Sequence, residues 1–97
     1  MASRGDVFST GITTIANNGY LSVSTGSNEV VIHNVYHPGS VILYRYNGTT
    51  RIAVSGTITG VGIVAGLQIH CTSTTYLQIQ NVSGDNQAIE VDGMNTK

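Results

Sequence analysis

Two histidines have a spacing that binds one metal ion when it occurs on a helix. His33 and His37 lie in segment 29–37, EVVIHNVYH, whose β-branched residues predict a strand instead. Residues four apart are neighbours on a helix, whereas in a strand they stand about 13 Å apart. One ion could not contact both rings, so we predict two histidines on a sheet face and no metal site.

The single cysteine, Cys71, follows His70, a pair of residue types that could form a nucleophile and its base. Segment 67–72 is predicted to be a strand, in which neighbouring side chains point to opposite faces. His70 therefore cannot activate Cys71, which shares a face with Leu67 and Ile69. We predict a buried, unreactive thiol, and a lone cysteine forms no internal disulfide.

Three carboxylates near the C-terminus, Asp85, Glu90 and Asp92, are the remaining acid–base candidates. Glu90 and Asp92 could share one strand face, as a glycosidase pair does, but no large loops are present to build a pocket around them. Their spacing is not that of a calcium loop, so we expect solvated surface charges. The glycine-rich segment 55–66 also lacks the lysine of a phosphate-binding loop. We predict no catalytic residue, no metal, no cofactor and no enzymatic activity.

Three tyrosines and an arginine form the constellation that looks most like a binding site: Tyr36, Tyr44, Arg45 and Tyr46. Tyr44 and Tyr46 share one strand face beside a hairpin tip. Tyrosines are amphipathic and are favoured at interfaces and in sugar stacking. Ordinary cross-strand packing, contact with another protein and a glycan site all remain open. Arg4, Val7 and Phe8 of the N-terminal segment are further candidates for contact with a partner.

Short motifs add little to these candidates. Arg4-Gly5-Asp6 spells a cell-adhesion tripeptide, and sequons begin at Asn47 and Asn81. A match of three residues is weak, and the N-terminal sequence MASRGDVFS has no apolar region typical of a secretion signal. We expect all three motifs to be without function.

Composition excludes several classes of protein. Four basic and five acidic residues give a net charge of −1, which cannot form a phosphate-binding stripe, so we predict no nucleic-acid partner. No apolar run approaches the length of a transmembrane helix, so no membrane partner is expected. Only 9% of the residues are charged, and the remaining surface is rich in Ser, Thr, Asn and Gly.

The strands that must position these residues are predicted by period-two alternation and by turns. Abundant Val, Ile and Thr favour an all-β chain with no helix. Strands are expected over segments 20–25, 29–37, 40–46, 49–54, 67–72, 76–82 and 87–92. Segment 29–37 has apolar residues on both faces, which predicts a central strand. Asn47-Gly48 predicts a hairpin with a type I′ turn.

Seven or eight short strands at this spacing predict a small antiparallel β-sandwich, jelly-roll-like in style. We expect one domain over residues 11–93, an extended or flexible N-terminal arm over residues 1–10, and a frayed tail over residues 94–97. A domain of 97 residues has a thin core. Many such domains gain the missing burial by oligomerising, so we expect a homo-oligomer or a chain bound to a larger assembly.

The stretch from Thr74 to Gly93, TTYLQIQNVSGDNQAIEVDG, resembles the last hairpin of compact jelly-roll modules in tailed-phage virions. Such modules serve as capsid decoration (cement) proteins or as tail and fibre heads. The resemblance implies a non-catalytic structural protein located in the virion, a trimer in which many copies bridge neighbouring subunits of a major capsid protein. The alternative is a carbohydrate-binding, lectin-like module that uses the same tyrosines.

Overall fold

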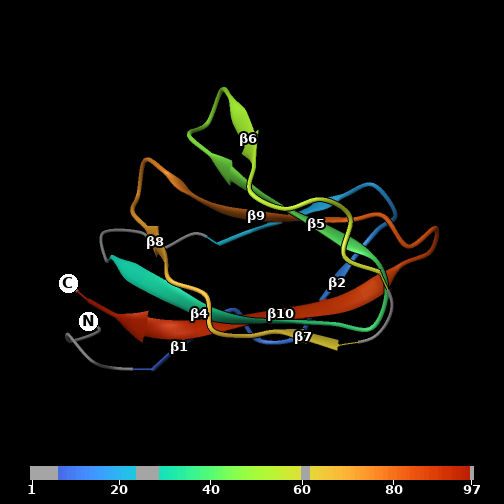
Figure 1. Ribbon diagram of the computed structural model, residues 1–97, viewed down its shortest axis with the longest axis horizontal. Coiled ribbons are helices and arrows are strands. Elements are labelled where there is room, and N and C mark those ends of the chain that lie inside the picture. Colours follow the sequence, from blue (N-terminus) through green and yellow to red (C-terminus); the bar gives the residue numbers. More distant parts are fainter. Residues whose placement is uncertain (1–6, 24–28, 60–61, 97) are drawn as a thin grey trace.

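The computed structural model describes residues 7–23, 29–59 and 62–96, and this part of the chain contains ten strands and no helix. The strands form two antiparallel sheets that face each other (Figure 1). Sheet I contains β1 (Val7–Ser9), β2 (Thr13–Ile15), β4 (Val30–His37), β7 (Gly62–Val64), β8 (Ile69–Cys71) and β10 (Gln87–Asn95). Sheet II contains β3 (Tyr20–Ser22), β5 (Val41–Tyr46), β6 (Arg51–Ala53) and β9 (Tyr76–Asn81).

The strand order is that of a jelly roll. Sheet I runs β1-β10-β4-β7, with β2 also paired to β10 and β8 also paired to β4, and sheet II runs β3-β9-β5-β6. The chain changes sheet between β2 and β3, β3 and β4, β4 and β5, β6 and β7, β8 and β9, and β9 and β10, as jelly rolls do. The predicted antiparallel β-sandwich is confirmed. There are more strands than predicted because both edges of sheet I are broken into two pieces, β1 with β2 and β7 with β8.

The core lies between the two sheets. It is made of inward-facing aliphatic residues with the period of two that the sequence predicts. Its buried members are Ile15, Leu21, Val23, Val30, Ile32, Val35, Val41, Leu43, Cys71, Leu77, Ile79, Ile89 and Val91. Because the described core contains no large aromatic residue, its stability rests on many small contacts.

Residues 7–9 and 94–96 take part in more pairing than the sequence predicts. Residues 1–6 of the expected arm lie outside the described residues, but Val7–Ser9 form β1 and pair with β10. Of the expected frayed tail, Met94 and Asn95 belong to β10, and the Thr96 amide donates to the Glu29 carbonyl at 2.8 Å. Pairing explains both differences, because β10 extends past Asp92 along β1 and β4.

A β-bulge in β4 changes which residues face the core. Asp92 pairs with Asn34 and Gly93 with Ile32, so His33 is an extra residue on β4. Strict alternation would place Tyr36 on the same face as Ile32. Instead Val35 and His37 are buried, and Tyr36 lies on the outer face.

The predicted hairpin forms, but its predicted turn is wrong. Tyr46 pairs with Arg51, which leaves a loop of residues 47–50 in place of a two-residue turn. A type I′ turn needs positive φ at both central residues, and Gly48 has φ 94° whereas Asn47 is not in that region. Asn47 instead accepts hydrogen bonds from the Thr49 and Thr50 amides at 2.9 and 2.7 Å.

Candidate functional site

The predicted tyrosine constellation is divided between two opposite surfaces. Tyr36 lies on the outer face of sheet I, whereas Tyr44 and Tyr46 lie on the outer face of sheet II. Arg45 belongs to neither surface, because its Nη1 donates to the His70 carbonyl of β8 and so links the two sheets. One contact patch made of all four residues is therefore not possible.

The N-terminal candidates also take separate places. Arg4 lies outside the described residues. Both other candidates belong to β1 and pair with β10. The backbone of Val7 pairs with Met94, and Phe8 pairs with Gly93 and packs against the core. Phe8 is thus mainly a core-covering residue, because β1 joins the sheet where the sequence predicts a free arm.

The outer face of sheet II carries a cluster of four tyrosines and an arginine, which we call the tyrosine–arginine cluster: Tyr20, Tyr44, Tyr46, Tyr76 and Arg51. Tyr20 and Tyr44 stand edge to face with ring centroids 6.0 Å apart, as do Tyr46 and Tyr76 at 5.9 Å. The Arg51 guanidinium lies 4.2 Å from the Tyr20 ring centre and 4.4 Å from that of Tyr46.

Glutamines of β9 hold this cluster in place. Arg51 Nε donates to Gln78 Oε1 at 2.8 Å, and the amide of Gln78 donates to Ser22 Oγ at 2.7 Å. The hydroxyl of Tyr44 donates to Gln80 Oε1 at 3.1 Å. Sequence pattern does not predict the place of Arg51, because a two-residue turn would place Thr49 opposite Tyr46. The four-residue loop places Arg51 there instead.

Replacing Arg51 by alanine is expected to lower the free energy of unfolding by about 1 kcal/mol, because two exposed cation–π contacts and one hydrogen bond are lost. Chemical denaturation followed by circular dichroism measures this change. The near-ultraviolet signal of the tyrosines should also change. Thr49→Ala in the same hairpin loop, where only the backbone amide bonds to Asn47, is the matched control and should alter neither quantity. Equal stability of both variants would contradict the stacking described above.

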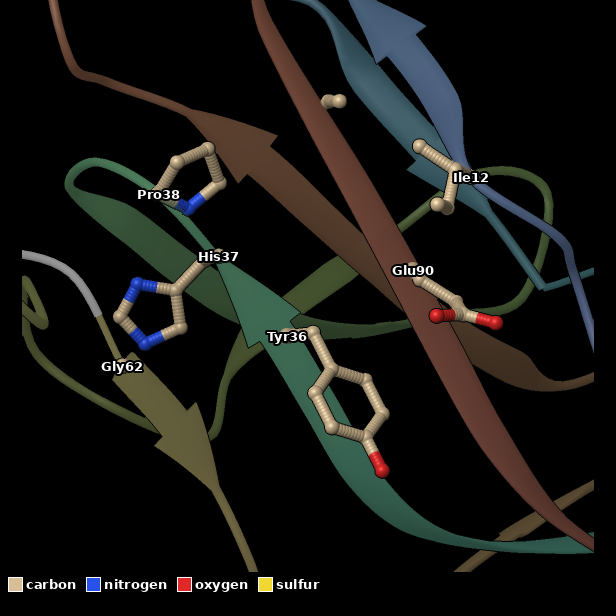
Figure 2. Close-up of a pocket in the computed structure, with 7 residues that line it drawn as sticks. Ile12, Tyr36, His37, Pro38, Gly62 and Glu90 are labelled. Atoms are coloured by element: carbon tan, nitrogen blue, oxygen red, sulfur yellow. The ribbon is translucent and has the colours of Figure 1, made fainter.

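A hollow of about 360 Å³ opens on the outer face of sheet I and is lined by Ile12, Tyr36, His37, Pro38, Gly62, Ala88 and Glu90. Figure 2 shows Tyr36 and Glu90 projecting from the neighbouring strands β4 and β10, with Ile12 beyond Glu90. Ile12 is 77% exposed, and Ile63, which pairs with Tyr36, is 59% exposed. The lining of the hollow is thus mostly apolar, with Tyr36, His37 and Glu90 as its polar members.

Hydrogen bonds fix the polar groups around this hollow. Tyr36 donates its hydroxyl proton to Asp92 Oδ2 at 2.9 Å, and Asn34 donates to the other oxygen of Asp92 at 2.8 Å. The hydrogen bond to Asp92 raises the pKa of Tyr36, helped by desolvation and by the charges of Asp92 and Glu90. Glu90 Oε2 accepts from Ser9 Oγ at 2.9 Å. Glu90 and Asp92 share a face, as predicted, but both are partly shielded and not freely solvated.

The other candidates for chemistry are separated. His37 is 4% exposed and its Nδ1 lies 2.9 Å from the Gly39 carbonyl oxygen, whereas His33 is the bulged residue of β4. His70 contacts Glu29 at 3.2 Å. Within residues 7–23, 29–59 and 62–96 no group of three or more His, Cys, Asp or Glu residues could hold a metal ion. The same ranges contain no helix long and apolar enough to cross a membrane.

Cys71 is buried, as predicted, and burial raises the pKa of its thiol. The Leu77 amide also donates to its sulfur at 3.4 Å. Because only the thiolate reacts, Cys71 should resist a thiol reagent at pH 8 in the native protein and react at once in denaturant. Absorbance during reaction with Ellman's reagent measures both rates. Rapid reaction of the native protein would show that β8 opens easily.

The chain resembles a known protein in its fold, but it matches no protein family. No family model and no curated protein sequence matches the chain. Among solved structures, the crystal structure of the Drosophila NLP core, described as giving insight into pentamer formation and histone binding, is similar. It aligns with 95% of this chain and 99% of its own, with a TM-score of 0.56 and 10% sequence identity. At that identity the likeness shows a shared β-sandwich fold and nothing about function.

Proposed function

We propose that this protein is a non-catalytic structural subunit that associates with copies of itself within a larger assembly. The observation that carries the proposal is the apolar outer face of sheet I, where Ile12, Ile63 and Met94 are 77%, 59% and 43% exposed. Exposed apolar surface beside polar groups is typical of interaction sites. A thin core and a net charge of −1 also favour association, since little repulsion opposes it.

The structural neighbour supports self-association and no more. The Drosophila NLP core is described in terms of pentamer formation, so a β-sandwich of this size is compatible with an oligomer. Histone binding, which is named for that protein, is not part of the function proposed for this chain. A strongly basic partner requires concentrated negative charge, and the chain has five acidic residues.

We further propose that the larger assembly is a virus particle, on which the protein acts as a decoration or cement subunit. The support is the resemblance of segment 74–93 to virion jelly rolls, together with the low content of charged residues, 9%. In this role the subunit adds buried area where neighbouring capsid subunits meet. A trimer would suit this role, as would other rings.

The experiment compares Ile63→Asp with wild type by light scattering at several concentrations. Ile63 lies on the short strand β7 and is exposed, so the variant should fold. We expect wild type to be an oligomer and Ile63→Asp to lose mass toward the monomer. Asn86→Asp, which adds the same charge in the exposed loop before β10, is the control. An oligomer that is unaffected by Ile63→Asp would reject this face as the contact.

Carbohydrate binding is a second candidate, favoured by the four tyrosines and two glutamine amides on the outer face of sheet II. Sugars stack on ring faces, but Arg51 already covers faces of Tyr20 and Tyr46. Titration with sugars followed by NMR distinguishes the two functions. Shifts concentrated on Tyr44 and Tyr46 in a monomeric protein would favour the lectin-like module.

A further inference from the structure

The polar groups at the hollow of sheet I are all hydrogen-bond acceptors. A carbonyl oxygen only accepts, so His37 Nδ1, 2.9 Å from the Gly39 oxygen, carries the proton. In the tautomer with its proton on Nδ1, Nε2 is an acceptor, and no hydrogen bond to it occurs among the described residues. It lies beside Gly62, because a Cβ at that position would be 4.0 Å from Nε2.

Tyr36 and Glu90 complete the set of acceptors. The proton of Tyr36 is used on Asp92, which leaves lone pairs on its oxygen. Glu90 accepts from Ser9 through Oε2, so Oε1 is available among the described residues. The floor of Ile12, Pro38 and Ala88 is apolar. A ligand that suits this hollow therefore has several donors, a positive charge and an aliphatic stem, as an arginine or lysine side chain has.

The opposite face of the same molecule presents such a group. Arg51 lies on the tyrosine–arginine cluster and bonds through Nε alone. Within the described part of the chain its two terminal nitrogens have no hydrogen-bond partner. The stacked rings hold the guanidinium ready to bind a carboxylate, which lowers the entropy lost on binding. Arg45 is already bound to the His70 carbonyl.

The charges on the two outer faces favour one of the ways in which two copies can associate. A symmetric pair through sheet I would bring two Glu90–Asp92 groups together, and a symmetric pair through sheet II would bring two Arg51 residues together. Like charges across an interface are strongly unfavourable. A head-to-tail contact of sheet I with sheet II instead pairs opposite charges and covers the exposed Ile12 and Ile63 of sheet I with the tyrosine rings of sheet II.

We propose that copies of this chain associate head to tail, with the Arg51 guanidinium of one copy bound by Glu90 in the hollow of the next. This inference rests on the proposed self-association and gives it a mechanism. Because the two faces point in opposite directions, a head-to-tail contact cannot close with two copies in the symmetric way of a dimer. It forms a ring of three or more copies, or an open filament if the rotation does not close.

Charge reversal tests the pair. Arg51→Glu and Glu90→Arg are each expected to raise the dissociation constant of the oligomer by on the order of 100-fold at low salt. The double variant R51E/E90R restores opposite charges at every contact and should assemble within about tenfold of wild type. Sedimentation gives the dissociation constants, and circular dichroism checks that each variant is folded. Asp85→Arg, in the exposed loop between β9 and β10, is the control.

The outcomes separate this inference from the proposed function. Weaker association of both single variants, together with association near that of wild type in the double variant, supports the head-to-tail pair. A wild-type oligomer that neither single variant weakens overturns the pair and leaves self-association standing. Folded single variants that dissociate without recovery in the double variant also overturn it. A wild-type monomer at every concentration overturns both proposals.

Discussion

Gly93→Ala is expected to cost about 3 kcal/mol or more of unfolding free energy, a large part of the roughly 5–15 kcal/mol typical of a small domain. A Cβ at position 93 would lie 2.0 Å from the Val31 carbonyl oxygen and 2.9 Å from the Ile32 Cα. Both atoms belong to the backbone of β4 at the bulge, so no side chain can turn away to make room. The close approach, and not an unusual φ, requires glycine here.

Urea denaturation followed by circular dichroism measures this loss. Gly56→Ala is the matched control, because a Cβ there meets nothing within 4 Å, and its stability should stay within about 0.5 kcal/mol of wild type. If Gly93→Ala were as stable as Gly56→Ala, the two strands would have to separate at the bulge without cost. The close packing of β4 against β10 would then be wrong.

Asn81→Ala is expected to cost about 3 kcal/mol, because a fully buried amide connects three parts of the chain. Its Nδ2 donates to the Ile15 and Asp85 carbonyls at 2.8 and 2.7 Å. Its Oδ1 accepts from Ser83, through both the amide and the hydroxyl, and from Gln87 Nε2 at 2.7 Å. Alanine leaves these buried groups without their partner.

Thermal unfolding of Asn81→Ala beside Asn86→Ala gives the comparison, since Asn86 is exposed in the loop that Asn81 supports. The first variant should melt well below wild type and the second near it. A small effect at position 81 would mean that water replaces the lost amide. The same burial makes the sequon at Asn81 inaccessible in the folded chain.

The fold could be predicted because alternation and turns act locally. The period of two in segments 41–46 and 76–81 places Val41, Leu43, Leu77 and Ile79 in the core, as expected. Alternation alone does not predict that Val35 and His37 of β4 are buried while Tyr36 faces outward. The bulge at His33 depends on Gly93, about sixty residues away in sequence, and only the pairing of β4 with β10 brings them together.

The candidate site depended even more on long-range pairing. The sequence favours one constellation of Tyr36, Tyr44 and Tyr46, but β4 and β5 belong to different sheets. Arg51 was missed because the loop of the hairpin has four residues and not two. The residues that line the hollow come from the segment before β2, from β4 and from β10, and the jelly-roll order brings these segments together.

The most direct test of self-association is the mass of the unmodified protein in solution, measured by light scattering over a wide range of concentration. A chain of 10.2 kDa that forms head-to-tail rings should reach a fixed multiple of three or more and dissociate as salt is raised. A mass of one chain at every concentration and salt would contradict the account.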